Sequence, residues 1–126
     1  MGIQPVSSSI LEPFENGVGS LCKTKESKDN KETLFFLFAE DRQSVSRLRF
    51  KTNHIRFSET LKTEISANSI SWLDREGFSN TRYQLNRTTL ELSTNPGKRA
   101  CEAMSAKSLK KSADNYLSSI MIGNKI

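Results

Sequence analysis

Two stretches near the middle of the chain alternate apolar and polar residues. In 44–50 and in 54–59, leucine, isoleucine and phenylalanine alternate with arginine and serine at most positions. This period of two is typical of strands with one buried face. Just before them, residues 33–39 read Thr-Leu-Phe-Phe-Leu-Phe-Ala. A continuous apolar run of this length predicts a core strand that is covered on both faces.

Shorter apolar stretches predict further strands on either side of this core. The segments concerned are 18–23, 69–73, 82–85, 90–92 and 99–104. Ile70 and Trp72 would share one face of their strand. Residues 74–77 and 95–97 contain the glycine, proline, aspartate and asparagine that tight turns require.

One of the predicted hairpins connects 82–85 with 90–92. We expect Leu85 to lie opposite Leu90, with a tight turn between them. That register places Tyr83 across from Leu92.

The apolar spacing changes to three and four residues after Ser105. This is the period of an amphipathic helix, which we predict over residues 106–122. Ser105 has a residue type that caps a helix N-terminus, and Gly123 is suited to the end of the helix. The predicted apolar stripe consists of Leu109, Ala113, Tyr116, Leu117, Ile120 and Met121.

These elements predict a β-dominated α+β fold. We expect an antiparallel meander of six to seven strands, curled into a small barrel or sandwich, with one C-terminal amphipathic helix. The 126 residues suffice for one compact core. The expected organisation is an N-terminal arm at 1–16, an antiparallel β domain at 17–104 and the helix at 105–123, packed on or beside the sheet.

A basic face follows from the register of the hairpin at 44–59. Its four apolar positions, Leu48, Phe50, Ile55 and Phe57, share one buried face only if Phe50 lies opposite Ile55. That register sets Arg49 opposite Arg56 and gathers basic side chains on the other, exposed face. The predicted anion- or partner-binding residues of this face are Arg47, Arg49, Lys51, His54 and Arg56.

Crowded basic residues on one hairpin face require a counter-charge. Like charges directly opposite each other in a sheet cost up to about 1 kcal/mol. A bound anion, phosphate or acidic protein surface would relieve that cost, and guanidinium groups suit both phosphate and carboxylate. The structural alternative is a carboxylate on a neighbouring strand, for which the candidates are Glu59, Glu64 and Glu91. A secondary basic patch is predicted on the helix at Lys107, Lys110 and Lys111.

The overall charge favours anionic partners. The chain carries 19 Lys and Arg against 14 Asp and Glu, a formal net charge of +5. Six bases against two acids fall in residues 95–126. A positive potential of this kind raises encounter rates with acidic proteins, nucleic acids and other polyanions.

Two cysteines leave two interpretations open. Cys22 and Cys101 fall near the first and last predicted strands, so a closed meander would bring them together. An oxidising compartment would then allow a disulfide. No secretory signal is apparent at the start of the chain, and no apolar run is long enough to span a membrane. We therefore expect a cytoplasmic protein with free thiols, and keep the disulfide as the alternative.

The residue types for catalysis are sparse. The chain has a single histidine, His54, and lacks the motifs of a nucleophilic elbow, a phosphate-binding glycine loop or a zinc site. We expect no catalytic residues, no cofactor and no bound metal.

A longer pattern resembles one found in small uncharacterised bacterial and phage β-proteins. Its parts are Ile-Ser-Trp at 70–72, Tyr-Gln-Leu-Asn-Arg-Thr-Thr-Leu-Glu-Leu at 83–92, Cys101, and Cys22 as a first cysteine. The resemblance covers residues 18–104 and implies a small antiparallel barrel or sandwich, with no function attached. The N-terminal arm and the C-terminal helix depart from the pattern.

The function that this pattern favours is non-catalytic binding. We expect the basic hairpin face to contact an acidic protein or another anion, in a setting compatible with a phage or virion. The alternative is a protein that binds the nucleic-acid backbone through the same face and the helix lysines. A remoter alternative is a secreted inhibitor or envelope protein with a Cys22–Cys101 disulfide. The sequence does not indicate an oligomeric state.

Overall fold

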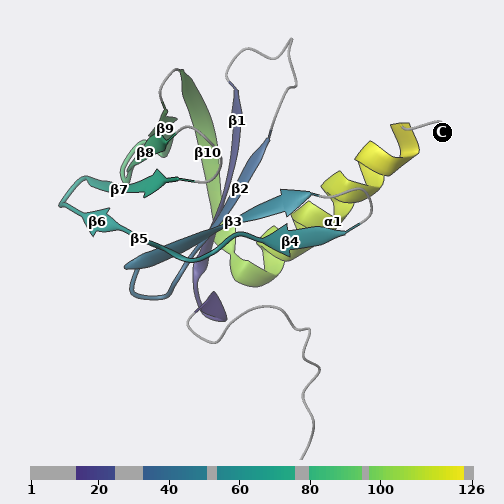
Figure 1. The fold of residues 1–126 in the computed structure, drawn as a ribbon, viewed down its shortest axis with the longest axis horizontal. Coiled ribbons are helices and arrows are strands. Elements are labelled where there is room, and N and C mark those ends of the chain that lie inside the picture. Colours follow the sequence, from purple (N-terminus) through teal and green to yellow (C-terminus); the bar gives the residue numbers. More distant parts are fainter. Residues whose placement is uncertain (1–13, 25–32, 51–53, 76–79, 95–96, 124–126) are drawn as a thin grey trace, which may run out of the picture.

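A computed structural model of the chain describes residues 14–24, 33–50, 54–75, 80–94 and 97–123. These residues form one antiparallel sheet and one helix (Figure 1). The strands are β1 (Val18–Thr24), β2 (Leu34–Phe38), β3 (Ser44–Phe50), β4 (Ile55–Phe57), β5 (Leu61–Lys62), β6 (Glu64–Ile65), β7 (Ser69–Asp74), β8 (Thr81–Asn86), β9 (Glu91–Ser93) and β10 (Lys98–Ser105). The helix is α1 (Ala106–Gly123).

The sheet consists of two meanders joined side by side. The strand order is β4-β3-β2-β1-β10-β9-β8-β7-β6, and β5 also pairs with β3. Strands β1 to β4 form one meander, strands β6 to β10 form the other, and the antiparallel pair β1–β10 joins them. The β-dominated antiparallel fold is confirmed. The described residues contain ten strands rather than six or seven, in part because the chain from 55 to 65 divides into three short ones.

The sheet is curled into a half-barrel, so its distant strands face each other. Phe36 and Phe38 of β2 contact Trp72 of β7, with ring centroids 5.1 and 5.3 Å apart, and Phe36 lies 5.2 Å from Tyr83 of β8. Ten buried residues form this inner core: Cys22, Leu34, Phe36, Phe38, Val45, Ile70, Trp72, Tyr83, Leu85 and Leu92. The prediction that Ile70 and Trp72 share a face is confirmed.

A second core lies on the outer face of the sheet, under α1. The helix packs against β1, β2, β4 and β10, on the side away from β7 to β9 (Figure 1). Leu109 and Ala113 of the helix are buried with Phe35 and Leu37 of β2. Strand β2 thus contributes side chains to both cores. All five residues of β2 are buried, which confirms the prediction of a strand covered on both faces. Ser105 caps the helix, since its Oγ accepts a hydrogen bond from the Ser108 amide at 3.1 Å.

The predicted register of the hairpin β3–β4 is confirmed. Leu48 pairs with Phe57, Arg49 with Arg56 and Phe50 with Ile55. The four apolar side chains all belong to the outer core. The arginines therefore lie on the inner side of the sheet.

The predicted register of the hairpin β8–β9 is wrong by two residues. Leu85 pairs with Leu92 instead of Leu90, and the partner of Tyr83 is Trp72 on β7. The physical reason is the turn that follows Asn86. The Oδ1 atom of the Asn86 side chain accepts hydrogen bonds from the amides of residues 88 and 89, at 2.8 and 2.9 Å. This turn continues to Leu90, which has a φ of 62°, so the loop is longer than a tight two-residue turn.

Several predictions fall partly or wholly outside the described residues. These are most of the N-terminal arm, the loop after β1, Lys51, two residues of the turn at 74–77 and two residues of the turn at 95–97. Phe14, near the end of the predicted arm, is described and buried in the outer core. Gly97 has a φ of 105°, a conformation that favours glycine.

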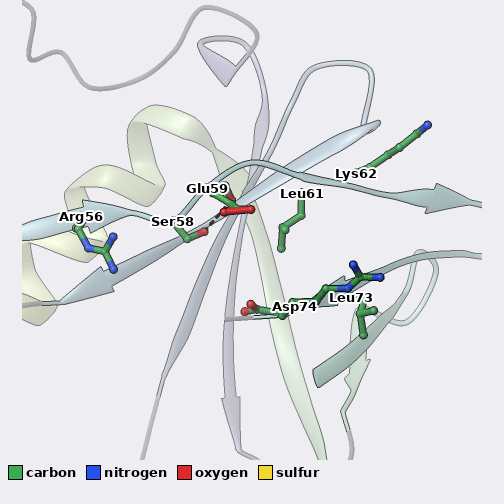
Figure 2. Close-up of a pocket in the computed structure, with 8 residues that line it drawn as sticks. Arg56, Ser58, Glu59, Leu61, Lys62, Leu73 and Asp74 are labelled. Atoms are coloured by element: carbon green, nitrogen blue, oxygen red, sulfur yellow. Dashed lines mark hydrogen bonds between the residues drawn. The ribbon is translucent and has the colours of Figure 1, made fainter. Parts of the chain in front are cut away.

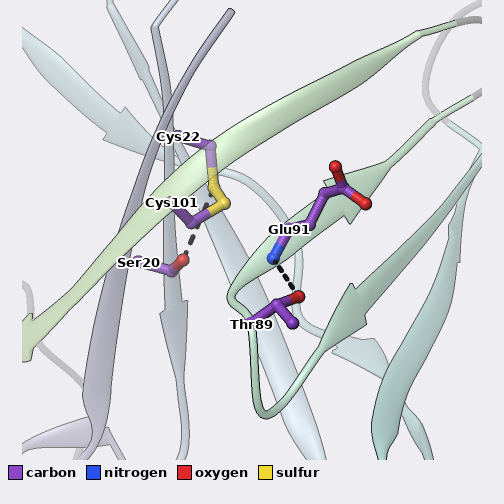
Figure 3. The surroundings of a disulfide bond; sticks show 5 residues. All are labelled: Ser20, Cys22, Thr89, Glu91 and Cys101. Carbon is purple, nitrogen blue, oxygen red and sulfur yellow. Dashed lines mark hydrogen bonds between the residues drawn. A yellow bond between two sulfur atoms is a disulfide. The ribbon is translucent and has the colours of Figure 1, made fainter. Parts of the chain in front are cut away.

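Cys22 and Cys101 form a disulfide between β1 and β10 (Figure 3). The expectation of free thiols is therefore wrong, and the alternative holds. The Cys101 amide donates to the Leu90 carbonyl at 2.9 Å, so its peptide groups point away from β1. The two cysteines thus occupy a non-hydrogen-bonded pair, where opposite Cα atoms approach most closely. Their Cα atoms are 4.0 Å apart.

Candidate functional site

The basic side chains of β3 lie on the inner face of the half-barrel. Arg47 pairs across the sheet with Phe36, an inner-core residue, and side chains that pair directly share a face. Arg49 lies two residues further along the same face. Both arginines are half-buried. The expected exposed hairpin face is therefore wrong, because α1 covers the other side of the hairpin and the sheet curls around the arginines.

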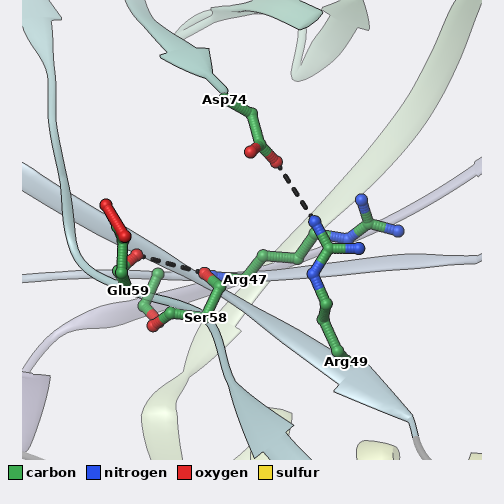
Figure 4. Close-up of polar contacts among 6 residues, drawn as sticks. Arg47, Arg49, Ser58, Glu59 and Asp74 are labelled. Atoms are coloured by element: carbon green, nitrogen blue, oxygen red, sulfur yellow. Dashed lines mark hydrogen bonds and ion pairs between the residues drawn. The ribbon is translucent and has the colours of Figure 1, made fainter. Parts of the chain in front are cut away.

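An ion pair crosses the mouth of the half-barrel. Arg49 Nη2 lies 3.3 Å from Asp74 Oδ2 (Figure 4). The two residues belong to β3 and β7, which are not neighbours in the sheet. The side chains are 26% and 10% exposed, respectively, so solvent screens this pair less than a surface pair. Asp74 is thus a counter-charge for Arg49, whereas the predicted candidates Glu64 and Glu91 pair with Arg82 and Lys98.

Arg99 of β10 and Tyr83 of β8 lie on the same inner face as Arg47, Arg49 and Asp74. Arg99 pairs with Leu92, an inner-core residue, and is half-buried on the same face. We call Arg47, Arg49 and Arg99, with Asp74 and Tyr83, the inner basic cluster. Three guanidinium groups and one carboxylate give it a formal charge of +2.

The pKa of Tyr83 depends on its burial and on the charges of the inner basic cluster. Burial raises the pKa of its phenol above the ordinary value of 10.0. The three arginines oppose this shift and Asp74 adds to it, so all four charges act on Tyr83. The phenol therefore stays protonated at neutral pH and keeps an O–H group for hydrogen bonding.

The buried nitrogen atoms of this face that have no hydrogen-bond acceptor among the described residues include Nε1 of Trp72 and Nε of Arg99. A buried donor left unsatisfied costs roughly 1–3 kcal/mol.

The remaining predicted site residues lie at the edge of this face or outside it. Arg56 pairs with Arg49 and is exposed on the edge strand β4, and His54 is exposed immediately before that strand. Lys51 lies outside the described residues. Lys107, Lys110 and Lys111 are exposed on α1, on the opposite side of the sheet. The structure therefore groups Arg47, Arg49 and Arg56 and separates them from the helix lysines.

A cleft opens between the two free sides of the half-barrel. We call it the seam cleft; its volume is about 480 Å³. One wall comes from the chain between β4 and β5, and the other from the end of β7 (Figure 2). Its lining residues are Arg56, Ser58, Glu59, Leu61, Lys62, Leu73, Asp74 and Arg75. Asp74 lines this cleft and also belongs to the inner basic cluster, so the two features adjoin.

Sequence reasoning missed Arg99, Tyr83 and Asp74 as members of the site. Arg99 comes from the opposite meander, and Asp74 is 25 residues from its partner Arg49. One signal was present: Arg99 stands two residues before Cys101, so a Cys22–Cys101 bridge would have placed it beside β1 on the inner face.

Comparison with known protein families, with curated proteins and with solved structures finds no match to this chain. Within the described residues, no three His, Cys, Asp or Glu side chains come close enough to hold a metal ion. The described helix lacks the length and apolar character needed to cross a membrane.

Proposed function

We propose that the protein is a non-catalytic binding protein whose inner basic cluster contacts an acidic protein or another anionic partner. The observation that carries this proposal is the convergence of Arg47, Arg49 and Arg99 from two meanders on one half-buried face. Half-buried guanidinium groups bind carboxylate and phosphate more strongly than exposed ones, because solvent screens them less.

A phage- or virion-associated setting is compatible with this proposal. The disulfide is a specific observation that favours the secreted inhibitor or envelope alternative over a cytoplasmic location, since such bridges persist in oxidising compartments. Binding through the inner basic cluster is compatible with either compartment.

The first experiment measures retention on immobilised polyglutamate and on heparin in a salt gradient. The variant R47Q/R99Q removes two charges from the inner basic cluster and keeps the Arg49–Asp74 pair. The matched control K107Q/K110Q removes two charges from the exposed face of α1. We expect the first variant to elute at a clearly lower salt concentration than the wild type, and the control to elute close to it. Thermal unfolding of both variants checks that they are folded.

Two outcomes would contradict the proposal. Loss of retention in K107Q/K110Q but not in R47Q/R99Q would move the site to the helix lysines. Absence of retention of the wild type at low salt would remove the anionic partner altogether. Binding of duplex DNA with a steep salt dependence, without binding of polyglutamate, would favour the nucleic-acid alternative.

A further inference from the structure

A small cavity lies at the end of the half-barrel that is opposite the inner basic cluster. We call it the end cavity; its volume is about 110 Å³. Strand β10 shows the separation. Arg99 lies two residues before Cys101, whereas Ala103, which lines the end cavity, lies two residues after it. The disulfide therefore stands between the two features on the inner face.

Apolar side chains from both meanders form most of the end cavity. They are Val18, Phe38, Ile70, Leu85, Leu90 and Ala103. Ser20 also lines the cavity, and its Oγ lies 3.4 Å from Cys22 Sγ. A wall of this composition favours a hydrocarbon group over a polar one.

The volume of the end cavity limits the size of that hydrocarbon group. An apolar cavity of about 150 Å³, engineered in another protein, holds one benzene ring. In proportion, a cavity of about 110 Å³ has room for about four to five carbon atoms. A long acyl chain would extend beyond it.

Two arginines, both accessible to solvent, also line the end cavity. Arg42 lies in the turn between β2 and β3, and Arg87 directly follows β8. Arg42 Nη1 donates to the carbonyls of Ala39 and Glu40. Arg87 Nη1 donates to the Ser66 carbonyl at 3.2 Å. A guanidinium group has five N–H donors, so each arginine is held by backbone and retains donors for a ligand.

No carboxylate of the described residues forms an ion pair with either arginine, and none lines the end cavity. Two acidic residues precede Arg42 in its turn. Asp41 Oδ1 accepts a hydrogen bond from the Gln43 amide at 3.0 Å, and Glu40 contacts Arg42 through its carbonyl group. The positive charge at the end cavity is therefore available to an anion.

The backbone is strained at two residues of the end cavity. Arg42 has a φ of 65° and Leu90 has a φ of 62°, and they are the two non-glycine residues with a positive φ in the described part of the chain. Glycine adopts this conformation without steric cost, whereas other residues rarely do. Strain of this kind clusters at ligand sites, so its occurrence here supports a binding role.

We propose that the end cavity binds a short aliphatic monocarboxylate of about five to six carbon atoms. The hydrocarbon chain fills the apolar cavity, and the carboxylate binds Arg42 and Arg87. A carboxylate has two oxygen atoms, one for each guanidinium group, and hydrogen bonds between two charged groups are strong. This site goes beyond the proposed function, because it uses none of the residues of the inner basic cluster.

The test titrates the wild type with hexanoate in isothermal titration calorimetry and follows the fluorescence of Trp72. Trp72 is the only tryptophan in the chain, and its ring centroid lies 5.3 Å from that of Phe38, which lines the end cavity. Acetate supplies the charge without the chain, and hexanamide supplies the chain without the charge. We expect saturable binding of hexanoate, about tenfold or more tighter than that of acetate or hexanamide.

Single substitutions test the position of the carboxylate. R42Q and R87Q each remove one guanidinium group. We expect each to weaken hexanoate binding about fivefold or more and to leave hexanamide binding within about twofold of the wild type. The control R82Q removes an exposed arginine of β8 that pairs with Glu64, and it should keep the wild-type affinity. If R42Q and R87Q weakened both ligands alike, their role would be structural and the inference would be wrong.

A larger side chain tests the position of the hydrocarbon chain. A103L fills the end cavity and keeps both arginines, so we expect it to weaken hexanoate binding about tenfold. The control A100L lies at an exposed position of the same strand, three residues earlier and thus on the other face of the sheet. It should bind hexanoate as the wild type does. Thermal unfolding of all variants checks that they are folded.

Three outcomes would overturn the inference. Hexanamide binding as tight as that of hexanoate would show a cavity that does not select an anion. Equal weakening by R82Q and R42Q would show unspecific attraction of charge. Weakening by R47Q/R99Q, with R42Q and R87Q unchanged, would move the carboxylate to the inner basic cluster. Failure of polyglutamate retention would instead overturn the proposed function and leave this inference intact.

Discussion

Tyr83 stands where the two meanders face each other across the half-barrel. Its ring contacts both Phe36 and Trp72, and its hydroxyl shares a field with three arginines and Asp74. Burial therefore decides its titration more than any single charge does, since desolvation is the largest contribution to its raised pKa.

A raised phenol pKa predicts a loss of stability at alkaline pH. The folded state binds the Tyr83 proton more tightly than the unfolded state, so the stabilising contribution is complete below pH 10.0 and falls as the pH rises further. One proton corresponds to a slope of at most about 1.4 kcal/mol per pH unit. We expect Y83F to unfold with a flatter pH dependence than the wild type in urea titrations between about pH 9 and 12. Equal slopes for Y83F and the wild type would contradict the prediction.

The arginines show what a residue-level pattern can and cannot determine. Alternation predicts that Arg47 and Arg49 share a face and that Leu48 and Phe50 share the other, and both statements are confirmed. It does not predict whether the arginine face is exposed or curled inward. That depends on which side α1 covers, and nothing in the pattern of the hairpin encodes it.

At the scale of elements, the contact between α1 and β1 depends on a glycine. A Cβ atom added at Gly19 would lie 2.5 Å from Leu109 Cβ and 2.9 Å from its Cγ. Leu109 is 1% exposed in the outer core, so it has little room to move. The absence of a side chain at Gly19 therefore sets how closely the helix approaches the sheet.

Adding one methyl group at this position should destabilise the protein. We expect G19A to lower the free energy of unfolding by about 1–3 kcal/mol, as overpacking of a filled core does. The urea midpoint measures the change. K23A, at an exposed position of the same strand, should stay within about 0.5 kcal/mol of the wild type. If G19A were as stable as K23A, the helix would have moved to accommodate the methyl group without a loss of unfolding free energy, and the prediction would be wrong.

Most elements were predictable because their signals are local. The period of two in β3 and the change of period at Ser105 both give the observed elements. The register of β8 and β9 was missed because Asn86 turns the chain through its own side chain, which lengthens the loop by two residues. The partners of Arg49 and Arg99 were missed because they come from strands that only the curl brings close.

At the scale of the whole molecule, the disulfide joins the two meanders. It links residues 79 positions apart in the central pair of strands. On the chain-entropy estimate, a bridge that closes a loop of this length stabilises the folded state by about 4.5 kcal/mol. The bridge therefore accounts for a large part of the stability that a domain of this size has.

Removing the bridge should lower the melting temperature substantially. We expect C22A/C101A, or the reduced wild type, to melt about 10–20 °C below the oxidised protein in calorimetry. Non-reducing mass spectrometry, in which the bridged chain is lighter by two hydrogens, confirms the redox state of each sample. A reduced protein that melts within about 2 °C of the oxidised one would show that the strand pair β1–β10 holds without the bridge.

The central position of β1 and β10 also constrains how the protein is made. Strand β1 is synthesised long before β10, which pairs with it, so the central strand pair of the sheet forms last. A nascent chain that stops short of β10 holds β1 with one edge bare, and bare strand edges recruit other chains. Its solubility during translation thus depends on the interval between the synthesis of β1 and that of β10, whose cysteines are 79 residues apart; this interval is about 4–16 seconds at cellular elongation rates.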